Sequence, residues 1–145
     1  SERELTKYRL ISGDLLVVRV NGSADLAGRL IAYEPQGEIV EAYCDHFIRL
    51  RLDSSRATPV FIRFVANSGA GRRYIESVLV TSAGQKTINQ TSLFELEVAL
   101  PPVTEQTEIV RRVEAVFKLA DRIETRCNAV RNCVVTSSLV CRLRV

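Results

Sequence analysis

The adjacent prolines Pro101 and Pro102 divide the sequence into two parts with different hydrophobic periodicity. Proline fixes its own φ angle, has no N–H to donate and restricts the residue before it, so neither a strand nor a helix can continue through the pair. Apolar residues before the prolines occur in short or alternating runs, whereas those after them recur at helical spacing. We therefore expect an α+β chain, in which a strand-rich lobe is followed by a long C-terminal helix of the coiled-coil type.

The lobe contains short apolar runs separated by turn signals. Four runs are expected to be strands, at residues 15–20, 30–34, 43–52 and 93–101. Two others, 58–68 and 74–83, fit a strand or a helix equally well. His46 falls on the apolar side of the alternation in 43–52, so it is expected to be a packed residue rather than a catalytic base.

Beyond the prolines, small or apolar residues recur at alternating steps of four and three. These residues form a heptad seam, made of Ile109, Val113, Val116, Ala120, Ile123, Cys127, Val130 and Val134. Thr104 is expected to cap the helix, with Glu105 in its positive first turn. A helix of about 30 residues is roughly 45 Å long, which exceeds what a lobe of this size needs. The seam is therefore expected to need a partner helix; the alternative is a helix lying along its own lobe.

The charge is unevenly distributed along the chain. Residues 1–103 contain 12 basic and 12 acidic side chains, so the net charge of +3 comes from residues 104–145. Within the neutral part, one stretch holds six arginines against the single acid Asp53: Arg49, Arg51, Arg56, Arg63, Arg72 and Arg73. A local basic patch can attract a polyanion, and the alternative is a solvated face of a sheet.

Several classes of site and protein find no support. No apolar run reaches the roughly 20 residues of a membrane span, and the N-terminus lacks the apolar core of a signal peptide. The four cysteines form no C-x-x-C pair, and the three in the C-terminal region are expected to be small packing residues in a reducing cytosol. The stretches NSGAGRR and TSAGQKT do not fit a phosphate-binding loop. We expect neither metal nor cofactor; a hydrolase using His46 remains an alternative, without a nucleophile-elbow motif.

Polar and basic residues in several loops suit nucleic acid. Glycines at 69–71 allow close backbone approach, arginine and lysine contact phosphate or guanine, and asparagine and glutamine can pair bidentately with adenine. The candidate DNA-facing residues are Arg19, Asn21, Arg72, Arg73, Lys86, Asn89 and Gln90.

Two stretches, GDLLVVRVNGSADLAGR and AGQKTINQTSLFELEVALPPVTEQTEIVRRVEAV, resemble the specificity subunit of type I restriction-modification systems. In that family a Leu-Pro-Pro-x-x-Glu-Gln-x-x-Ile-Val motif opens a long conserved helix. The matching residues are Leu100, Pro101, Pro102, Glu105, Gln106, Ile109 and Val110. The resemblance extends from about residue 10 to about residue 134.

The resemblance implies a non-catalytic subunit that reads DNA sequence. In the family, each target recognition domain reads half of a bipartite target, and the conserved helices pack as an antiparallel coiled coil that also binds the methyltransferase subunits. A restriction subunit completes the enzyme. Here 1–102 would be part of a recognition domain, 103–135 the conserved helix and 136–145 a tail. The residues assigned to helix packing and subunit docking are Glu105, Gln106, Ile109, Val113, Val116, Ala120 and Ile123.

The chain also departs from the family pattern. The usual first part of the recognition domain does not precede residue 1, and the tail RNCVVTSSLVCRLRV differs from the usual end. We expect either a fragment or a half-subunit that pairs with another chain, including by self-association through the helix, in the cytoplasm. The alternative function is a coiled-coil interaction module that does not bind DNA.

Overall fold

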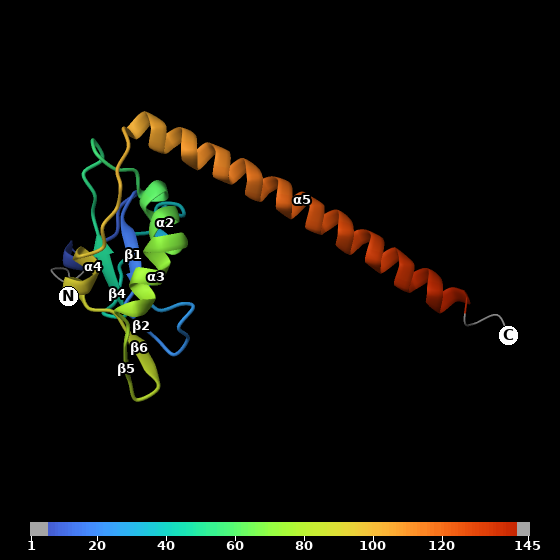
Figure 1. Cartoon of the computed structure of the whole chain (residues 1–145), viewed down its shortest axis with the longest axis horizontal. Helices are drawn as coiled ribbons and strands as arrows, with labels where there is room; N and C mark the ends of the chain where they lie inside the picture. Colours follow the sequence, from blue (N-terminus) through green and yellow to red (C-terminus); the bar gives the residue numbers. More distant parts are fainter. Residues whose placement is uncertain (1–5, 142–145) are drawn as a thin grey trace. The chain divides into compact units, whose positions relative to one another are not determined.

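The computed structural model describes residues 6–141, with side chains to residue 131. It divides into two compact units, one ending at Thr107 and one beginning at Glu108. The first unit combines short strands and helices, and the second is formed by the helix α5, Val103–Cys141, beyond its first turn (Figure 1). The expected α+β class is confirmed. No helix within residues 6–141 is both long and apolar enough to cross a bilayer.

The strand β1 (Leu15–Val18) lies at the centre of the first sheet. It pairs antiparallel with β3 (Leu30–Ala32) on one side and with β4 (Phe47–Leu50) on the other. Leu15 and Val17 are fully buried whereas their neighbours are half-buried, as expected when alternate side chains point to opposite faces. The core of the lobe therefore lies on the Leu15–Val17 face of this sheet.

A second sheet has the strand order β2-β6-β5. Its strands are β2 (Val20–Asn21), β5 (Val80–Ser82) and β6 (Gln85–Thr87), all antiparallel. The strand predicted at 15–20 is thus confirmed but divided, because the chain passes from one sheet to the other at Arg19.

The first ambiguous segment forms a helix, and the second continues one before β5 begins. The helix α2 (Pro59–Asn67) begins with proline at a position where its missing N–H costs nothing. The helix α3 (Gly69–Ser77) follows after Ser68 and packs against α2 beside β1 (Figure 1). A Cβ atom on Gly71 would lie 2.3 Å from the carbonyl oxygen of Val65. Gly71 of NSGAGRR therefore serves the contact between two helices.

Two strand predictions were wrong in extent or type. Residues 93–101 form no strand: Leu93 and Phe94 are the last residues of the helix α4 (Gln90–Phe94). The Asn89 side chain caps the start of this helix by accepting a hydrogen bond from the Ser92 N–H. Phe94 is 71% exposed, so the alternation did not mark a buried face. In the 43–52 segment only β4 is extended, and His46 precedes it with its side chain 64% exposed. The expectation of a packed histidine was therefore wrong.

Arg72 is not a surface residue, although the sequence placed it in the DNA-facing set. It is 8% exposed, and Nε donates to Glu76 Oε1 at 2.8 Å. Nη1 donates to the carbonyl of Ala27 at 2.9 Å, and Nη2 donates to the carbonyl of Ala24. The guanidinium thus holds the loop before β3 against α3. We withdraw Arg72 from the DNA-facing set.

Gln106 connects the start of α5 to the lobe. Its side chain is fully buried, and Oε1 accepts a hydrogen bond from the Thr58 N–H at 2.9 Å. Nε2 donates to the carbonyls of Arg56 and Pro101, both at 2.8 Å. All the polar atoms of this amide are engaged within the lobe, so the expectation that Gln106 docks another subunit was wrong.

The helix α5 begins at Val103, and the Pro102 carbonyl accepts the Gln106 N–H at 3.0 Å. Thr104 therefore lies inside the first turn and is not the cap that the sequence predicted. The long helix itself is confirmed. Its seam residues Val116, Ile123 and Val130 are each more than half exposed. The Val134 side chain and the last four residues of the expected tail lie outside the described part of the chain.

The Gln106 network predicts a specific loss of stability. In Gln106→Ala, two carbonyls and one N–H lose their partner, at about 1–3 kcal/mol for each group that stays buried. We expect the free energy of unfolding in urea to fall by about 3 kcal/mol, less than the sum because water enters the space. The exposed neighbour Glu105→Ala is the control, expected within about 0.5 kcal/mol of wild type. Equal stability of both variants would contradict the network.

The neighbouring arginines Arg72 and Arg73 provide a second matched pair, since Arg73 is exposed. Hydrogen bonds to a charged group contribute about 1.5–3 kcal/mol, so Arg72→Ala should destabilise the lobe by at least about 2 kcal/mol. Arg73→Ala should change stability by no more than about 0.5 kcal/mol. Urea denaturation followed by circular dichroism measures both. If Arg72→Ala is as stable as wild type, the Arg72 side chain is not needed inside the lobe and is again a candidate for contact with DNA.

Candidate nucleic-acid interface

The second sheet brings three polar side chains together in one row. Asn21 pairs with Lys86, and Lys86 pairs with Thr81 on its other side. Residues directly opposite one another in a sheet point to the same face, so all three side chains share one face. Lys86 Nζ donates to Thr81 Oγ1 at 3.2 Å. The row thus combines an ammonium, an amide and a hydroxyl, and Thr81 was not among the predicted residues.

The loop between β6 and α4 is held from behind by Ile88. This residue is fully buried, and its N–H donates to the Arg19 carbonyl at 3.0 Å. Asn89 and Gln90 follow it and are exposed, as is Arg19. The buried Ile88 therefore holds the predicted residues Asn89 and Gln90 at the surface beside Arg19.

A polar hollow of about 240 Å³ lies where these residues meet β4. Its walls contain two arginines and no carboxylate; the lining residues are Arg19, Tyr43, Phe47, Ile48, Arg49, Asn89 and Gln90. An arginine-lined concavity without acids favours an anion such as a phosphate group. The structure thus brings three predicted residues, Arg19, Asn89 and Gln90, to one site.

Two polar residues of the hollow, Arg49 and Tyr43, were absent from the predicted set. The Arg49 guanidinium carbon lies 5.2 Å from the centre of the Tyr43 ring, and Nη1 donates to the Arg9 carbonyl at 2.8 Å. Tyr43 in turn meets Tyr8 edge to face, with 5.3 Å between ring centres. The run of arginines from Arg49 was the signal for the first residue. Nothing in the local pattern indicated that Tyr43 would stand beside it.

The six arginines of that run do not form a single patch. Arg51 donates to both carboxylate oxygens of the fully buried Asp14, at 2.7 and 2.9 Å. Burial raises the pKa of Asp14, but the hydrogen bonds from Arg51 and from the Ile11 N–H outweigh it and hold the pKa below its ordinary value. Arg63 stacks on Phe64, 4.7 Å from the ring centre. The arginines of this run are therefore less clustered in space than they are in the sequence.

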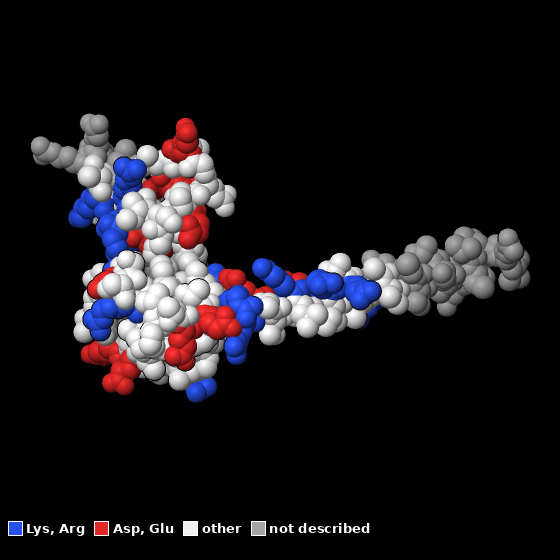
Figure 2. All heavy atoms as spheres, turned by 90° about the horizontal axis from the view of Figure 1, so that it is seen from above, with Lys and Arg blue, Asp and Glu red and all other residues white. Residues whose placement is uncertain are grey.

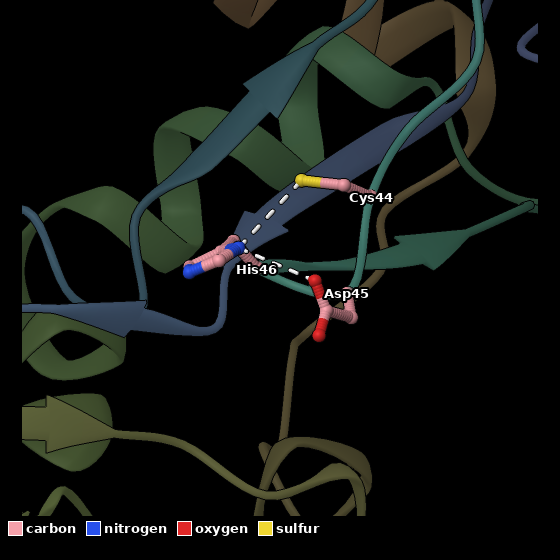
Figure 3. A group of neighbouring side chains, drawn as sticks. All are labelled: Cys44, Asp45 and His46. Atoms are coloured by element: carbon pink, nitrogen blue, oxygen red, sulfur yellow. Dashed lines mark hydrogen bonds and ion pairs between the residues drawn. The ribbon is translucent and has the colours of Figure 1, made fainter.

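Cys44, Asp45 and His46 form the one group of three potential metal ligands within the described residues (Figure 3). The His46 Nδ1 lies 3.8 Å from Cys44 Sγ and 3.3 Å from Asp45 Oδ1. All three side chains are exposed, and a structural zinc site uses four enclosed ligands. Both contacts converge on the same ring nitrogen, whereas a catalytic triad uses one nitrogen for the nucleophile and the other for the acid. The group therefore does not favour the hydrolase alternative.

The helix α5 carries two distinct faces. Each residue turns the helix by about 100°, so the basic residues Arg111, Lys118 and Arg122 lie opposite the heptad seam, whereas Arg126 flanks it. Figure 2 shows basic side chains gathered along one edge of α5 and uncharged ones along the other. Arg111 and Arg112 both bind Glu108 at 2.7 Å and lower its pKa to about 2. The exposed seam is thus available to a partner.

No family model matches the sequence. The chain is 57% identical over 126 residues to the type I restriction enzyme StySPI specificity subunit of Salmonella potsdam, which covers 87% of this chain and 27% of that protein. It is 39% identical over 128 residues to the EcoKI specificity subunit of Escherichia coli K12, covering 88% of this chain and again 27% of the relative.

The chain spans about a quarter of the length of these curated relatives. A putative type I restriction enzyme specificity subunit, MjaX of Methanocaldococcus jannaschii, is 27% identical over 76% of the chain. The sequence motif at the start of α5 and these relatives agree: over the stretch compared, the chain belongs to the family of type I restriction enzyme specificity subunits.

Proposed function

We propose that this chain recognises one half of a bipartite DNA target and directs methyltransferase and endonuclease subunits to it, without catalytic activity, metal or cofactor of its own. The observation that carries the proposal is the 57% identity to the StySPI specificity subunit over most of the chain. In this assignment, residues 1–102 are part of a target recognition domain, 103–135 are the conserved helix and 136–145 a tail.

The DNA-facing surface consists of the Asn21–Lys86–Thr81 row and the arginine-lined hollow. Arg19, Asn21, Lys86, Asn89 and Gln90 remain from the predicted set, and Arg73 remains because it is exposed. Arg49, which lines the hollow, joins them. In this assignment the arginines and the Asn21–Lys86–Thr81 row position the protein on the phosphate backbone, and Asn89 and Gln90 contact base edges.

The exposed seam of α5 is the docking surface for partner helices. Its members Ile109, Val116 and Ile123 are each at least a third exposed, and its Ala120 and Cys127 are small. Small seam residues bury less area per heptad than leucine, so the helix gains most from a partner that lies along its whole length. Such a partner is a second conserved helix or a methyltransferase subunit.

The decisive experiment is co-expression of this chain, in its complete subunit, with a candidate methyltransferase subunit, followed by mapping of methylated sites. We expect a stable complex and methylation at one bipartite motif. A complex that forms but shows no sequence preference would favour the coiled-coil interaction module. Absence of both complex and motif would refute the proposal.

Lys86 should contribute electrostatic contact with the phosphate backbone. We expect Lys86→Ala to weaken binding to all duplexes similarly, and to make the slope of log affinity against log salt shallower by about 1. The matched control is Lys118→Ala, because Lys118 is an exposed lysine on α5. Fluorescence anisotropy across a salt series measures both. A loss confined to one DNA sequence would assign Lys86 to base reading instead.

The seam should be required for assembly but not for the fold of the lobe. We expect Val116→Gln combined with Ile123→Gln to abolish co-purification with the methyltransferase subunit, because two exposed apolar contacts are lost. Lys118→Gln combined with Arg122→Gln changes the opposite face of the same turns and should leave co-purification intact. If both double variants behave alike, the docking surface lies elsewhere on α5.

A further inference from the structure

The ribbon formed by β5 and β6 protrudes at one end of the lobe (Figure 1). Its strands are joined by the two residues Ala83 and Gly84, whose φ angles are +49° and +77°. Two consecutive positive φ angles are typical of the tight turn that matches strand twist in a hairpin. The ribbon therefore ends in a compact tip, and the last cross-strand pair before the turn is Ser82 with Gln85.

The tip is exposed and free of negative charge. Every residue from Val80 to Gln85 is exposed, and Lys86 is the one charged residue between Glu76 and Glu95. The major groove of DNA is about 12 Å wide and admits a two-stranded ribbon. An acid-free ribbon meets no electrostatic barrier between the two phosphate backbones.

Neighbouring residues of β6 have their side chains on opposite faces of the ribbon. Successive side chains of a strand point to opposite faces, so Gln85 and Lys86 face in opposite directions. Lys86 shares its face with Asn21 and Thr81, whereas Gln85 shares the other with Ser82. The ribbon can therefore present Lys86 toward a backbone while Gln85 faces the base edges.

The side-chain amides near the ribbon differ in whether they already form hydrogen bonds within the lobe. Asn21 Oδ1 accepts the Ser23 N–H at 2.9 Å, and Asn89 Oδ1 accepts the Ser92 N–H at 2.7 Å. These two amides are oriented by a turn and by a helix cap. The Gln85 amide makes no hydrogen bond within the described part of the chain. Both its acceptor and its donors are therefore free to orient on a base.

We propose that the β5–β6 ribbon enters the major groove and that Gln85 is a specificity-determining residue that reads an adenine. The Gln85 amide donates to N7 and accepts from the N6 amino group, the bidentate pairing that suits glutamine. This inference rests on the proposed function, because it requires the lobe to bind duplex DNA. It adds to that function the residue Gln85, which is outside the predicted DNA-facing set, and the groove that the ribbon enters.

The test is selection of bound sequences from a random 30-base-pair duplex library by the complete specificity subunit, with the wild-type chain and with variants. We expect wild type to enrich a motif containing an adenine, and Gln85→Ala to lose preference at that position by roughly tenfold, the discrimination typical of one bidentate pair. Gln85→Glu should shift the preference to cytosine, because a carboxylate accepts from the cytosine N4 amino group.

The matched control is Gln36→Ala, which removes an exposed glutamine from a loop flanked by Glu34 and Glu38. Its enriched motif should equal that of wild type. If Gln85→Ala and Gln85→Glu both enrich the wild-type motif, the Gln85 inference is overturned while DNA recognition stands. If wild type itself shows no salt-dependent binding to any duplex, the proposed function fails as well. Circular dichroism of each variant verifies that the fold is intact.

Discussion

The buried amide of Gln106 is the interaction on which the junction of the molecule depends. One side chain satisfies backbone groups of three residues, Arg56, Thr58 and Pro101, that lie 5 to 50 positions away along the chain. Only an amide can do this, because the site needs one acceptor and two donors at the same carbon, without charge. A carboxylate would place an acceptor against two carbonyls. The first turn of α5 is thereby part of the lobe, although the helix beyond Thr107 forms a separate unit.

The candidate DNA surface depends on buried groups that lie behind it. Ile88 anchors the Asn89–Gln90 segment, and Arg72 holds the carbonyls of the loop that follows Asn21. Gly28 in that loop has φ +74°, and a Cβ there would lie 2.3 Å from Ile75 Cγ2. Because the supporting groups are buried, exposed side chains such as Arg19, Gln85 and Gln90 can change with little effect on stability, whereas Asn89 also caps α4.

The predictions for Arg72 and His46 were wrong for a common reason. Arg72 and Arg73 are identical neighbours, yet one is bonded inside the lobe and the other is exposed. Their directions are set by α3, which begins at Gly69, whereas the sequence analysis placed both arginines in a loop. The prediction that His46 is packed was wrong because the strand β4 begins at Phe47, one residue after His46. The alternation that placed His46 on the apolar face therefore does not apply to it. In both cases an error in secondary structure became an error in exposure.

The sequence by itself determined the break at Pro101-Pro102, the long helix with its heptad seam, the central strand β1 and the family resemblance. These follow from local backbone chemistry and from periodicity, which neighbouring residues encode directly. Only the tertiary structure decided that Gln106 and Arg72 are internal and that Asn21, Lys86 and Thr81 share one face. The physical reason is distance along the chain: the Arg72 and Gln106 bonds reach partners 45 to 50 residues away, and no local pattern records such partners.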